Sequence, residues 1–390
     1  MPQLILLRGA KQVLTLRGPS GVRRGAALHD LGIIEDGSVL IRDGIIAAVG
    51  LTRRLENLKE ARTALEIPVN GRIVMPGFVD ASLSLSLNGA RHARKRKKAG
   101  EFYDESLALL RSCLQHGTLA ADVKASADDH CFHSDISVLR KLAAIGSNPV
   151  RMIRTWRING RTDSAAGETC DFGPTFEVLA RRKLMHFIEL TEQSQSIFDE
   201  RAIAIAQQAR IGIKLLWPVG SSNALADLLA RIRPRAVCCC VSSARADELD
   251  VLARTPAITV FATGKDVFEG PAGTTARRVA DAGGAIALSS GYDSSSAASF
   301  SMQMSIALAV VRLGLSTEEA FQAATINAAY AAGCGHLTGS LECGKQADAL
   351  ILNVNDYREV PRQFGINHVE MAIRQGSIVM NRTRWKAAAN

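Results

Sequence analysis

The middle of the chain alternates short apolar runs with longer amphipathic stretches. The runs have the length and composition of buried strands, and the stretches space their apolar residues as helices do. Eight strands alternating with helices over about 250 residues predict an α/β fold, the (β/α)8 TIM barrel. A doubly wound sheet is the alternative, although no Gly-x-Gly-x-x-Gly motif follows an early strand. The expected strands are 73–79, 119–123, 150–155, 183–190, 212–216, 236–240, 259–262 and 285–288, and the expected helices include 105–115, 136–144, 199–209, 224–231 and 274–282.

Both ends of the chain have a different pattern, with short β-prone runs separated by turn residues. Arg42-Asp43-Gly44 and Arg374-Gln375-Gly376 each separate two such runs and predict hairpins. Two β-rich ends around a long middle indicate a small discontinuous domain. We expect a barrel over 76–335 and a composite β-sandwich-like domain from 1–75 and 336–390. The β-prone runs are 4–7, 13–16, 38–41, 45–49, 349–352, 371–373 and 377–380.

Composition excludes several classes of protein. The chain has 390 residues, of which 47% are hydrophobic and 22% charged, which excludes a disordered polymer, a collagen-like fibre and a small disulfide scaffold. No run approaches the roughly 18 apolar residues of a membrane span, and the first apolar stretch is too short for a signal peptide. Eight cysteines without a Cys-x-x-Cys pair fit a reducing compartment. We expect a cytoplasmic protein.

The chain is basic, with 47 Lys and Arg against 38 Asp and Glu and a formal net charge of +9. Part of this excess lies in one run, Arg91-His-Ala-Arg-Lys-Arg-Lys-Lys98. No aromatic residues interleave with the run, so a solvated loop is the favoured interpretation. Binding of an anion or a nucleic acid through residues 91–98 is kept as the alternative.

Several motifs occur in an order that carries a family resemblance. They are Val74-Met-Pro-Gly-Phe-Val-Asp80, Asp122-Val-Lys124 after His116-Gly-Thr118, Thr325-Ile-Asn-Ala-Ala329, Gly339-Ser-Leu-Glu-Cys-Gly-Lys-Gln-Ala-Asp348 and Asp356-Tyr-Arg-Glu-Val-Pro-Arg-Gln-Phe-Gly-Ile-Asn-His368. Together they resemble the amidohydrolase superfamily, and the last of them resembles the imidazolonepropionases. The resemblance covers essentially the whole chain. It implies a barrel with a composite β-domain, a metal-dependent hydrolase that opens the ring of imidazolone propionate, and a homodimer.

The same resemblance implies where metal ligands should stand, and this chain departs from the pattern there. The family has His-x-His at the end of the first barrel strand, further histidines on strands five and six, and an aspartate at the end of strand eight. The corresponding positions here carry Ser82, Ser84, Leu216, Cys239 and Gly291. The positions on strands five and six rest on spacing alone.

This exchange removes most of the donor atoms that a catalytic metal needs. A serine hydroxyl is a poor zinc ligand, Leu and Gly offer none, and catalytic zinc takes three N, S or carboxylate ligands. Without a metal the pKa of water stays near 15.7 instead of falling to about 7, so hydroxide is scarcer by 8–9 powers of ten, roughly 12 kcal/mol. We therefore expect no metal, no other cofactor and no inherited hydrolysis.

Other residues remain as candidates for a surviving site. Asp293 follows Gly291 by two residues and offers a carboxylate at the barrel mouth, against a loop or capping role. Arg91 resembles a family arginine that holds the substrate carboxylate, against a role that merely opens the basic loop. Lys124 and Glu192 match family positions that face the barrel mouth.

For three further groups of residues, a structural role is favoured over a catalytic or metal-binding one. His130-Cys131-x-His133 offers three soft ligands, but its span is too short for good geometry without a distant partner, so a surface turn is favoured. A nucleophilic role for Cys239 conflicts with its apolar neighbours, which raise a thiol pKa. His186 lies in a strand-like apolar run and is expected in the core.

Three functions follow from these observations. The first is a metal-free pseudo-enzyme that binds a small molecule in the barrel mouth, as a homodimer or beside an active paralogue. The second is a hydrolase of C–N bonds in a small cyclic amide or amidine, with an altered site that uses Asp293. The third is an anion or nucleic-acid binder through residues 91–98. We expect the first, and we expect neither membrane nor nucleic-acid partners.

Overall fold

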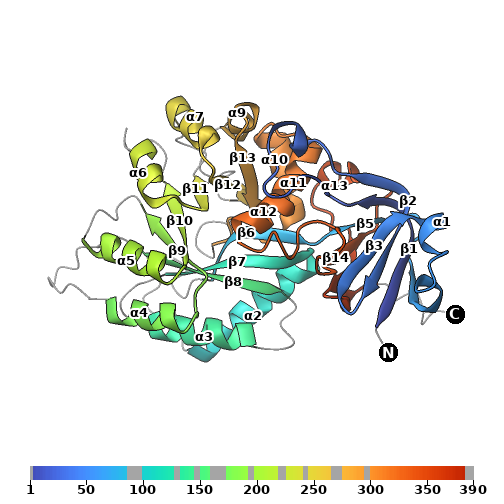
Figure 1. Ribbon diagram of the computed structural model, residues 1–390, viewed down its shortest axis with the longest axis horizontal. Helices are drawn as coiled ribbons and strands as arrows, with labels where there is room; N and C mark the ends of the chain where they lie inside the picture. The colour runs from blue at the N-terminus through green and yellow to red at the C-terminus, as the bar shows by residue number, and fades with distance from the viewer. Residues whose placement is uncertain are drawn as a thin grey trace.

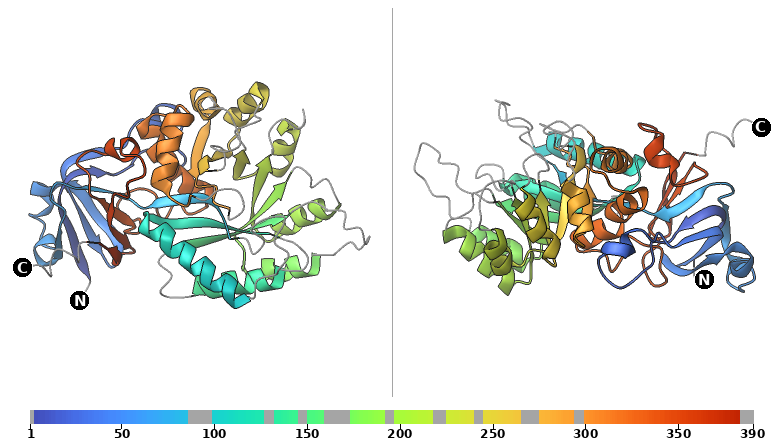
Figure 2. Two further views of the ribbon diagram at one scale, coloured as in Figure 1. Left: turned by 180° about the vertical axis from the view of Figure 1, so that it is seen from behind. Right: turned by 90° about the horizontal axis from the view of Figure 1, so that it is seen from above.

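The fold consists of two β-sheets, each formed by a different part of the chain (Figure 1). The computed structural model describes residues 3–85, 99–126, 132–144, 150–158, 173–191, 197–217, 225–239, 245–264, 275–293 and 299–382. Figure 2 shows from two further sides that the terminal sheet and the helix-covered sheet lie next to each other. The prediction of a barrel with a second sheet built from the chain ends is confirmed.

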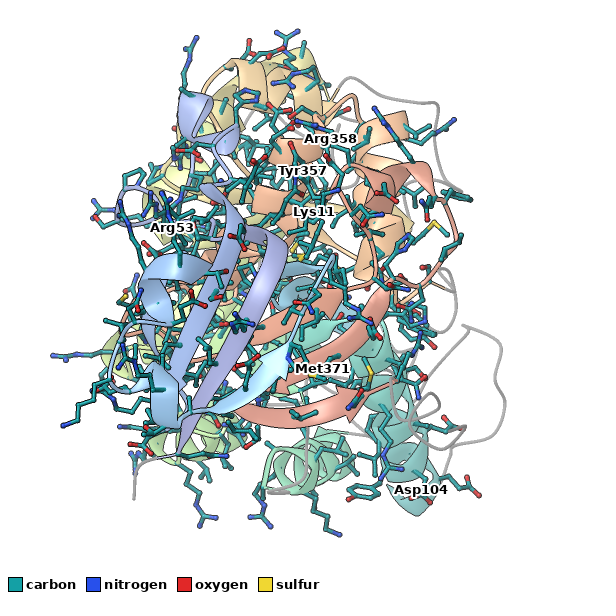
Figure 3. All side chains as sticks on the ribbon, turned by 90° about the vertical axis from the view of Figure 1, so that its right-hand side faces the viewer. Lys11, Arg53, Asp104, Tyr357, Arg358 and Met371 are labelled. Carbon is teal, nitrogen blue, oxygen red and sulfur yellow. The ribbon has the colours of Figure 1, made fainter. Side chains whose placement is uncertain are left out.

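The terminal sheet brings the two ends of the chain together. Its strands run in the order β16-β15-β14-β5-β1-β2-β3, with β4 paired to β1. β5 and β14 join the two ends as antiparallel neighbours, and Val74 lies opposite Ile351. The strands are β1 (Leu4–Leu14), β2 (Ile33–Arg42), β3 (Ile45–Leu51), β4 (Leu65–Pro68), β5 (Ile73–Pro76), β14 (Ala349–Leu352), β15 (Val369–Arg374) and β16 (Ser377–Asn381). Figure 3 views this sheet face on, with Met371 on β15.

Both predicted hairpins form, and their turns explain the residues found there. Asp43 and Gly44 have φ angles of 49° and 79°, and Gln375 and Gly376 have φ angles of 48° and 74°. Two successive residues with positive φ form the type I′ turn that matches the twist of paired strands. Gly44 also has the backbone of Gln375 where a side chain would stand, 2.6 Å from an added Cβ.

The second sheet is an eight-stranded parallel barrel whose strands follow one another in chain order. The strands are β6 (Phe78–Ser84), β7 (Thr118–Ser126), β8 (Arg151–Ile158), β9 (Phe187–Thr191), β10 (Gly212–Trp217), β11 (Ala236–Cys239), β12 (Ile258–Ala262) and β13 (Ala285–Ser289). The covering helices are α2 (Ala99–Gln115), α3 (Phe132–Ala144), α4 (Gly173–Arg181), α5 (Ile197–Gln208), α6 (Leu225–Ile232), α7 (Ala246–Arg254), α9 (Thr275–Asp281), α10 (Met302–Arg312), α11 (Thr317–Ala324) and α12 (Ile326–Ala331). Two short helices, α1 (Thr52–Leu55) and α13 (Glu359–Arg362), accompany the terminal sheet and its connections.

Four of the expected strands differ from the observed ones in their number or their limits. The run 73–79 splits at Gly77 into β5 of the terminal sheet and β6 of the barrel, because a Cβ at Gly77 would lie 2.4 Å from Leu119 and Pro76 lacks an N–H for pairing. The runs 4–7 and 13–16 are one strand, β1, with an irregular register between Leu7 and Ala10. The run 183–190 becomes a strand only from Phe187.

The core is aliphatic and has two layers around the barrel wall. An outer core packs the outward side chains of the strands, such as Ile188 and Leu215, against the helices. An inner cluster fills the barrel with Val79, Ala120 and Phe187, and continues into the residues of α12. Within the described residues, no helix is long and apolar enough to cross a membrane.

Candidate functional site

Charged side chains cross the interior of the barrel. Asp122 and Lys124 lie on β7, and Lys214 lies on β10. Since β8 and β9 separate these two strands in the sheet, Lys214 reaches Asp122 only through the barrel interior. Glu189 on β9 and Arg157 on β8 complete the group. We call these five side chains the barrel ion network.

The carboxylates of the barrel ion network each hold two cations. Asp122 Oδ2 lies 2.7 Å from Lys124 Nζ and 2.5 Å from Lys214 Nζ. Glu189 lies 2.8 Å from Lys124 Nζ and 2.6 Å from Arg157 Nε. The side chains of both carboxylates are fully buried, whereas that of Arg157 is 22% exposed. The network therefore runs from the barrel interior to a partly open arginine.

Burial disfavours the charged forms of these side chains, and the opposite charges of their neighbours offset this cost. Burial alone would raise the pKa of Asp122, but Lys124 and Lys214 outweigh it and hold that pKa below its usual value. Burial alone would also raise the pKa of Glu189, but Arg157 and Lys124 hold it below the ordinary range. Lys214 and Lys124 share one oxygen of Asp122, and burial lowers the pKa of Lys214. Removing Asp122 would leave Lys214 buried without the carboxylate that it pairs with, whereas Lys124 would keep Glu189.

A third buried carboxylate, Asp80, joins the first and last strands of the barrel. Asp80 Oδ1 accepts hydrogen bonds from the backbone N–H groups of Ser82 and Ser290, both at 3.1 Å, and Oδ2 accepts one from the Ser290 hydroxyl. The Ser84 N–H donates to the carbonyl of Tyr292 at 3.0 Å. These bonds explain physically why the motif ending at Asp80 needs a carboxylate. Burial raises the pKa of Asp80 to about 6.

Asp80 predicts a pH dependence of stability. Its native pKa of about 6 lies above its ordinary value of 3.8, so between these values the native state holds a proton that the unfolded state has released. Stability from this group is therefore fully present below pH 4 and falls as pH rises to 6, by about 3 kcal/mol. Urea unfolding of the wild type and of Asp80→Asn across this range should show the wild type losing stability relative to the variant as pH rises from 4 to 6. A difference independent of pH would contradict the assignment.

At the positions implied for metal ligands, the structure shows which side of the barrel wall several of the side chains point to. Leu83 and Leu85 pack in the outer core, so Ser84 between them points to the opposite side of the strand. The alternation is interrupted at Ser82, because Ala81 belongs to the inner cluster and the register with β7 shifts between Asp80 and Leu83. Leu216 packs against the inner cluster, as its assignment to an inward position requires. Gly291 has a φ of 63°, and a Cβ there would lie 2.8 Å from that of Ala262.

On the sixth barrel strand the register differs by one residue from the expectation. Cys239 packs in the outer core, whereas Cys238 belongs to the inner cluster. The Cys238 thiol lies 3.5 Å from Glu189 Oε1, and burial raises its pKa to about 12. A thiol with this pKa stays protonated at neutral pH, which does not suit a nucleophile.

The residues at these strand ends do not fit a catalytic metal. They offer two neutral hydroxyls from Ser82 and Ser84, an aliphatic side chain from Leu216, no side chain from Gly291 and one thiol from Cys238. Zinc and iron in hydrolases require several deprotonated N, S or carboxylate donors. In the described part of the chain, no three His, Cys, Asp or Glu side chains are grouped where they could hold a metal ion.

The other expected site residues are only partly brought together. Asp293 is half-buried beyond β13, and its charge contributes to raising the pKa of Arg157. Lys124 is buried near the end of β7, between the carboxylates of Asp122 and Glu189. Arg91, Glu192, and His130 with Cys131 lie outside the described residues, as does the side chain of His133.

His186 is not a core residue as the sequence suggested. It is exposed in the turn before β9, where its Nδ1 accepts a hydrogen bond from the backbone N–H of Arg154 at 3.0 Å. The strand begins only at Phe187, because Lys183 adopts a left-handed φ of 53° and the chain turns there. The apolar run around His186 therefore includes a turn.

Sequence reasoning missed most of the barrel ion network. The available signal was a single charged residue inside an otherwise apolar strand, as at Glu189 in β9 and Lys214 in β10. A charge at such a position is rarely buried without a partner. Finding the partners required the tertiary structure, since 92 residues separate Lys214 from Asp122.

Comparison with known proteins agrees with this architecture. The family model described as "Amidohydrolase family" matches residues 40–379. Imidazolonepropionase of Geobacillus kaustophilus is 29% identical and that of Parabacteroides distasonis 28%, with alignments that cover 97% and 96% of this chain and 98% and 99% of theirs. Among solved structures, ochratoxinase of A. niger superposes with a TM-score of 0.72 at 15% identity, covering 98% of this chain and 96% of its own. A zinc-bound adenosine deaminase from Xanthomonas campestris gives 0.71 at 16% identity, covering 97% and 93%. The chain belongs to the amidohydrolase family and resembles the imidazolonepropionases within it.

Proposed function

We propose that this chain is an imidazolonepropionase-like barrel that has lost its metal site and the inherited hydrolysis, and that it acts as a binding or partner subunit. One observation carries the proposal. The strand ends that would hold the metal present hydroxyls at Ser82 and Ser84, an apolar side chain at Leu216 and no side chain at Gly291. The register of β11 adds that Cys239 points away from the barrel interior.

The chemical consequence is large. Hydrolysis at neutral pH needs a water activated by about 8 pKa units, and a bound metal supplies this activation. Serine hydroxyls near a buried network of mutually paired charges offer no comparable activation of water. General-base catalysis by a single carboxylate contributes about 10²–10⁴-fold, which leaves most of the barrier in place.

The framework around the lost ligands is intact, which favours a retained binding role over decay of the whole fold. Asp80 still joins the first and last barrel strands, and the barrel ion network still fills the interior. Two partly exposed side chains offer opposite charges to a small polar ligand. They are Arg157, the most exposed member of the network, and Asp293, which follows β13. Assembly as a homodimer, or with an active paralogue, belongs to the same proposal.

The proposal is tested by turnover and metal content of the purified full chain. We expect no hydrolysis of imidazolone propionate above the uncatalysed rate, with or without added zinc, iron or manganese. Plasma mass spectrometry should find well under one metal per chain. Imidazolonepropionase of Geobacillus kaustophilus, assayed in parallel, serves as the positive control. One equivalent of metal together with turnover would overturn the proposal.

A second candidate is a hydrolase that cleaves C–N bonds of a small cyclic amide or amidine through an altered site. The full-length similarity to imidazolonepropionases and the carboxylate of Asp293 near Arg157 favour it. If hydrolysis of such a compound is detected, Asp293→Ala should reduce kcat by about 10²–10⁴-fold without lowering the melting temperature. Activity that survives this substitution unchanged would exclude Asp293 as the base.

A further inference from the structure

A row of exposed basic side chains lies at one end of the barrel, apart from the site described above. Four successive turns lead from α4, α5, α6 and α7 into β9, β10, β11 and β12. The turns span 181–186, 209–211, 232–235 and 255–257, and together with Arg254 at the end of α7 they contain no Asp or Glu. We call their exposed cations the basic arc: Arg182, Lys183, Arg210, Arg233, Arg235 and Arg254.

Barrel geometry places these turns side by side. β9 to β12 are consecutive parallel neighbours, with Phe187 opposite Gly212, Lys214 opposite Ala236, and Ala236 opposite Ile258. Neighbouring strands lie 4.7–4.9 Å apart, so the four strand starts span about 15 Å. Figure 1 shows the matching helices α4 to α7 on the half of the barrel away from the terminal sheet.

The arc has a defined backbone. Lys183, Arg210 and Arg233 adopt left-handed φ angles of 53°, 57° and 44°, each directly after a helix. Arg235 is anchored differently, since its guanidinium carbon lies 6.0 Å from the ring centroid of Phe187, which also contacts Lys214 at 4.2 Å. The basic side chains therefore project from fixed positions.

These cations form few close contacts with acids of the described structure. None of the six forms a salt bridge with a described Asp or Glu, whereas the neighbouring Arg181 approaches Glu177 at 3.9 Å. Arg254 acts on Asp250, one turn earlier in α7, only at longer range. Other acids of these helices stand in their first turns, as Asp227 does in α6 and Asp247 in α7.

Stabilisation of helix ends explains only part of this arrangement. A cation in the last turn of a helix interacts favourably with the helix dipole, which accounts for Arg254 in α7. It does not account for Arg235, which follows Pro234 at the start of a strand, or for two cations in each of two turns.

We propose that the basic arc binds the phosphate backbone of a nucleic acid. Five of its six cations are arginines, whose planar fork pairs with phosphate oxygens in a bidentate manner. The turns contain no Phe, Tyr or Trp, and His186 is their one aromatic side chain, so contacts to phosphates rather than stacked bases are expected to dominate. The proposal goes beyond the proposed function and does not rest on it, and it concerns a surface distinct from the run 91–98.

The test is fluorescence anisotropy of a labelled DNA or RNA duplex titrated with the full chain at about 50 and about 200 mM salt, where phosphate contacts lose affinity steeply. Arg210→Glu/Arg233→Glu should weaken binding at least about tenfold and flatten the salt dependence. Arg53→Glu/Arg62→Glu makes the same charge change on the terminal-sheet side, where Figure 3 shows Arg53, and should leave affinity within about twofold of wild type. Arg182→Glu/Arg254→Glu is a second arc variant, and thermal melting checks that each variant is folded.

Several outcomes would overturn the proposal. One is the absence of salt-dependent binding by the wild type. Another is an equal loss in the arc and control variants, which would reduce the effect to net charge. A loss that follows only neutralisation of Lys95, Arg96, Lys97 and Lys98 would assign binding to the 91–98 run. Equally strong competition by polyglutamate would replace the nucleic acid by an acidic protein as partner.

Discussion

Asp122→Ala should unfold this protein more readily than any exposed substitution, with a loss of about 3–5 kcal/mol in the free energy of unfolding. The carboxylate of Asp122 is fully buried, and Lys124 and Lys214 lie 2.7 and 2.5 Å from the same oxygen. Its removal leaves the Lys214 ammonium inside the barrel without the carboxylate that it pairs with, and leaves Lys124 with Glu189 alone. Urea denaturation monitored by circular dichroism measures the loss directly.

Two further variants test whether this loss comes from the buried charges rather than from the removal of a carboxylate in general. Asp247→Ala removes a carboxylate that pairs with Arg245 at 2.6 Å on the surface, and it should leave the urea midpoint essentially unchanged. Asp122→Ala/Lys214→Met should recover part of the stability, because it also removes the Lys214 ammonium, which loses its carboxylate in Asp122→Ala. If Asp122→Ala were no worse than Asp247→Ala, the barrel ion network would not be what stabilises the interior.

Gly291→Asp should destabilise the protein by about 2–4 kcal/mol instead of rebuilding a metal ligand. An aspartate is the residue that the family resemblance implies at this position. Here the backbone has a φ of 63°, and an added Cβ would lie 2.8 Å from the Cβ of Ala262. Urea denaturation gives the size of the loss, and metal content per chain should stay as low as in the wild type.

Gly71→Asp is the matched control for this substitution. Gly71 has a similar φ of 74°, but no atom lies within 4 Å of its added Cβ. The difference between the two variants therefore measures the contact with Ala262 apart from the backbone cost. A loss in Gly291→Asp no larger than in Gly71→Asp would show that the eighth strand end accepts a side chain after all.

The barrel, the hairpins and the family were predictable because their signals are local. Alternation of apolar runs with amphipathic stretches identifies strands and helices within windows of about ten residues. Asp43-Gly44 and Gln375-Gly376 specify tight turns through their own backbone preferences. The family motifs carry their own order along the chain.

Predictions failed where two elements compete for the same residues or where a strand has two possible faces. The run 73–79 reads as one strand, yet β5 and β6 belong to different sheets, and the break at Gly77 depends on Leu119. In the run Cys238-Cys239-Cys240, the residue types alone do not distinguish which cysteine points into the barrel. Side chains alternate along a strand, so an error of one residue exchanges the barrel interior for the outer core.

The sequence by itself determined the succession of elements, the family and the residue types that stand at Ser82, Ser84 and Gly291, since each depends on residue identity or near neighbours. The tertiary structure decided which charges meet. Lys214 finds Asp122 across 92 residues of chain, and Ser290 finds Asp80 across 210. Burial makes such pairs necessary, because a charge in the barrel interior is stable only beside its counter-charge, but only closure of the barrel selects the partner.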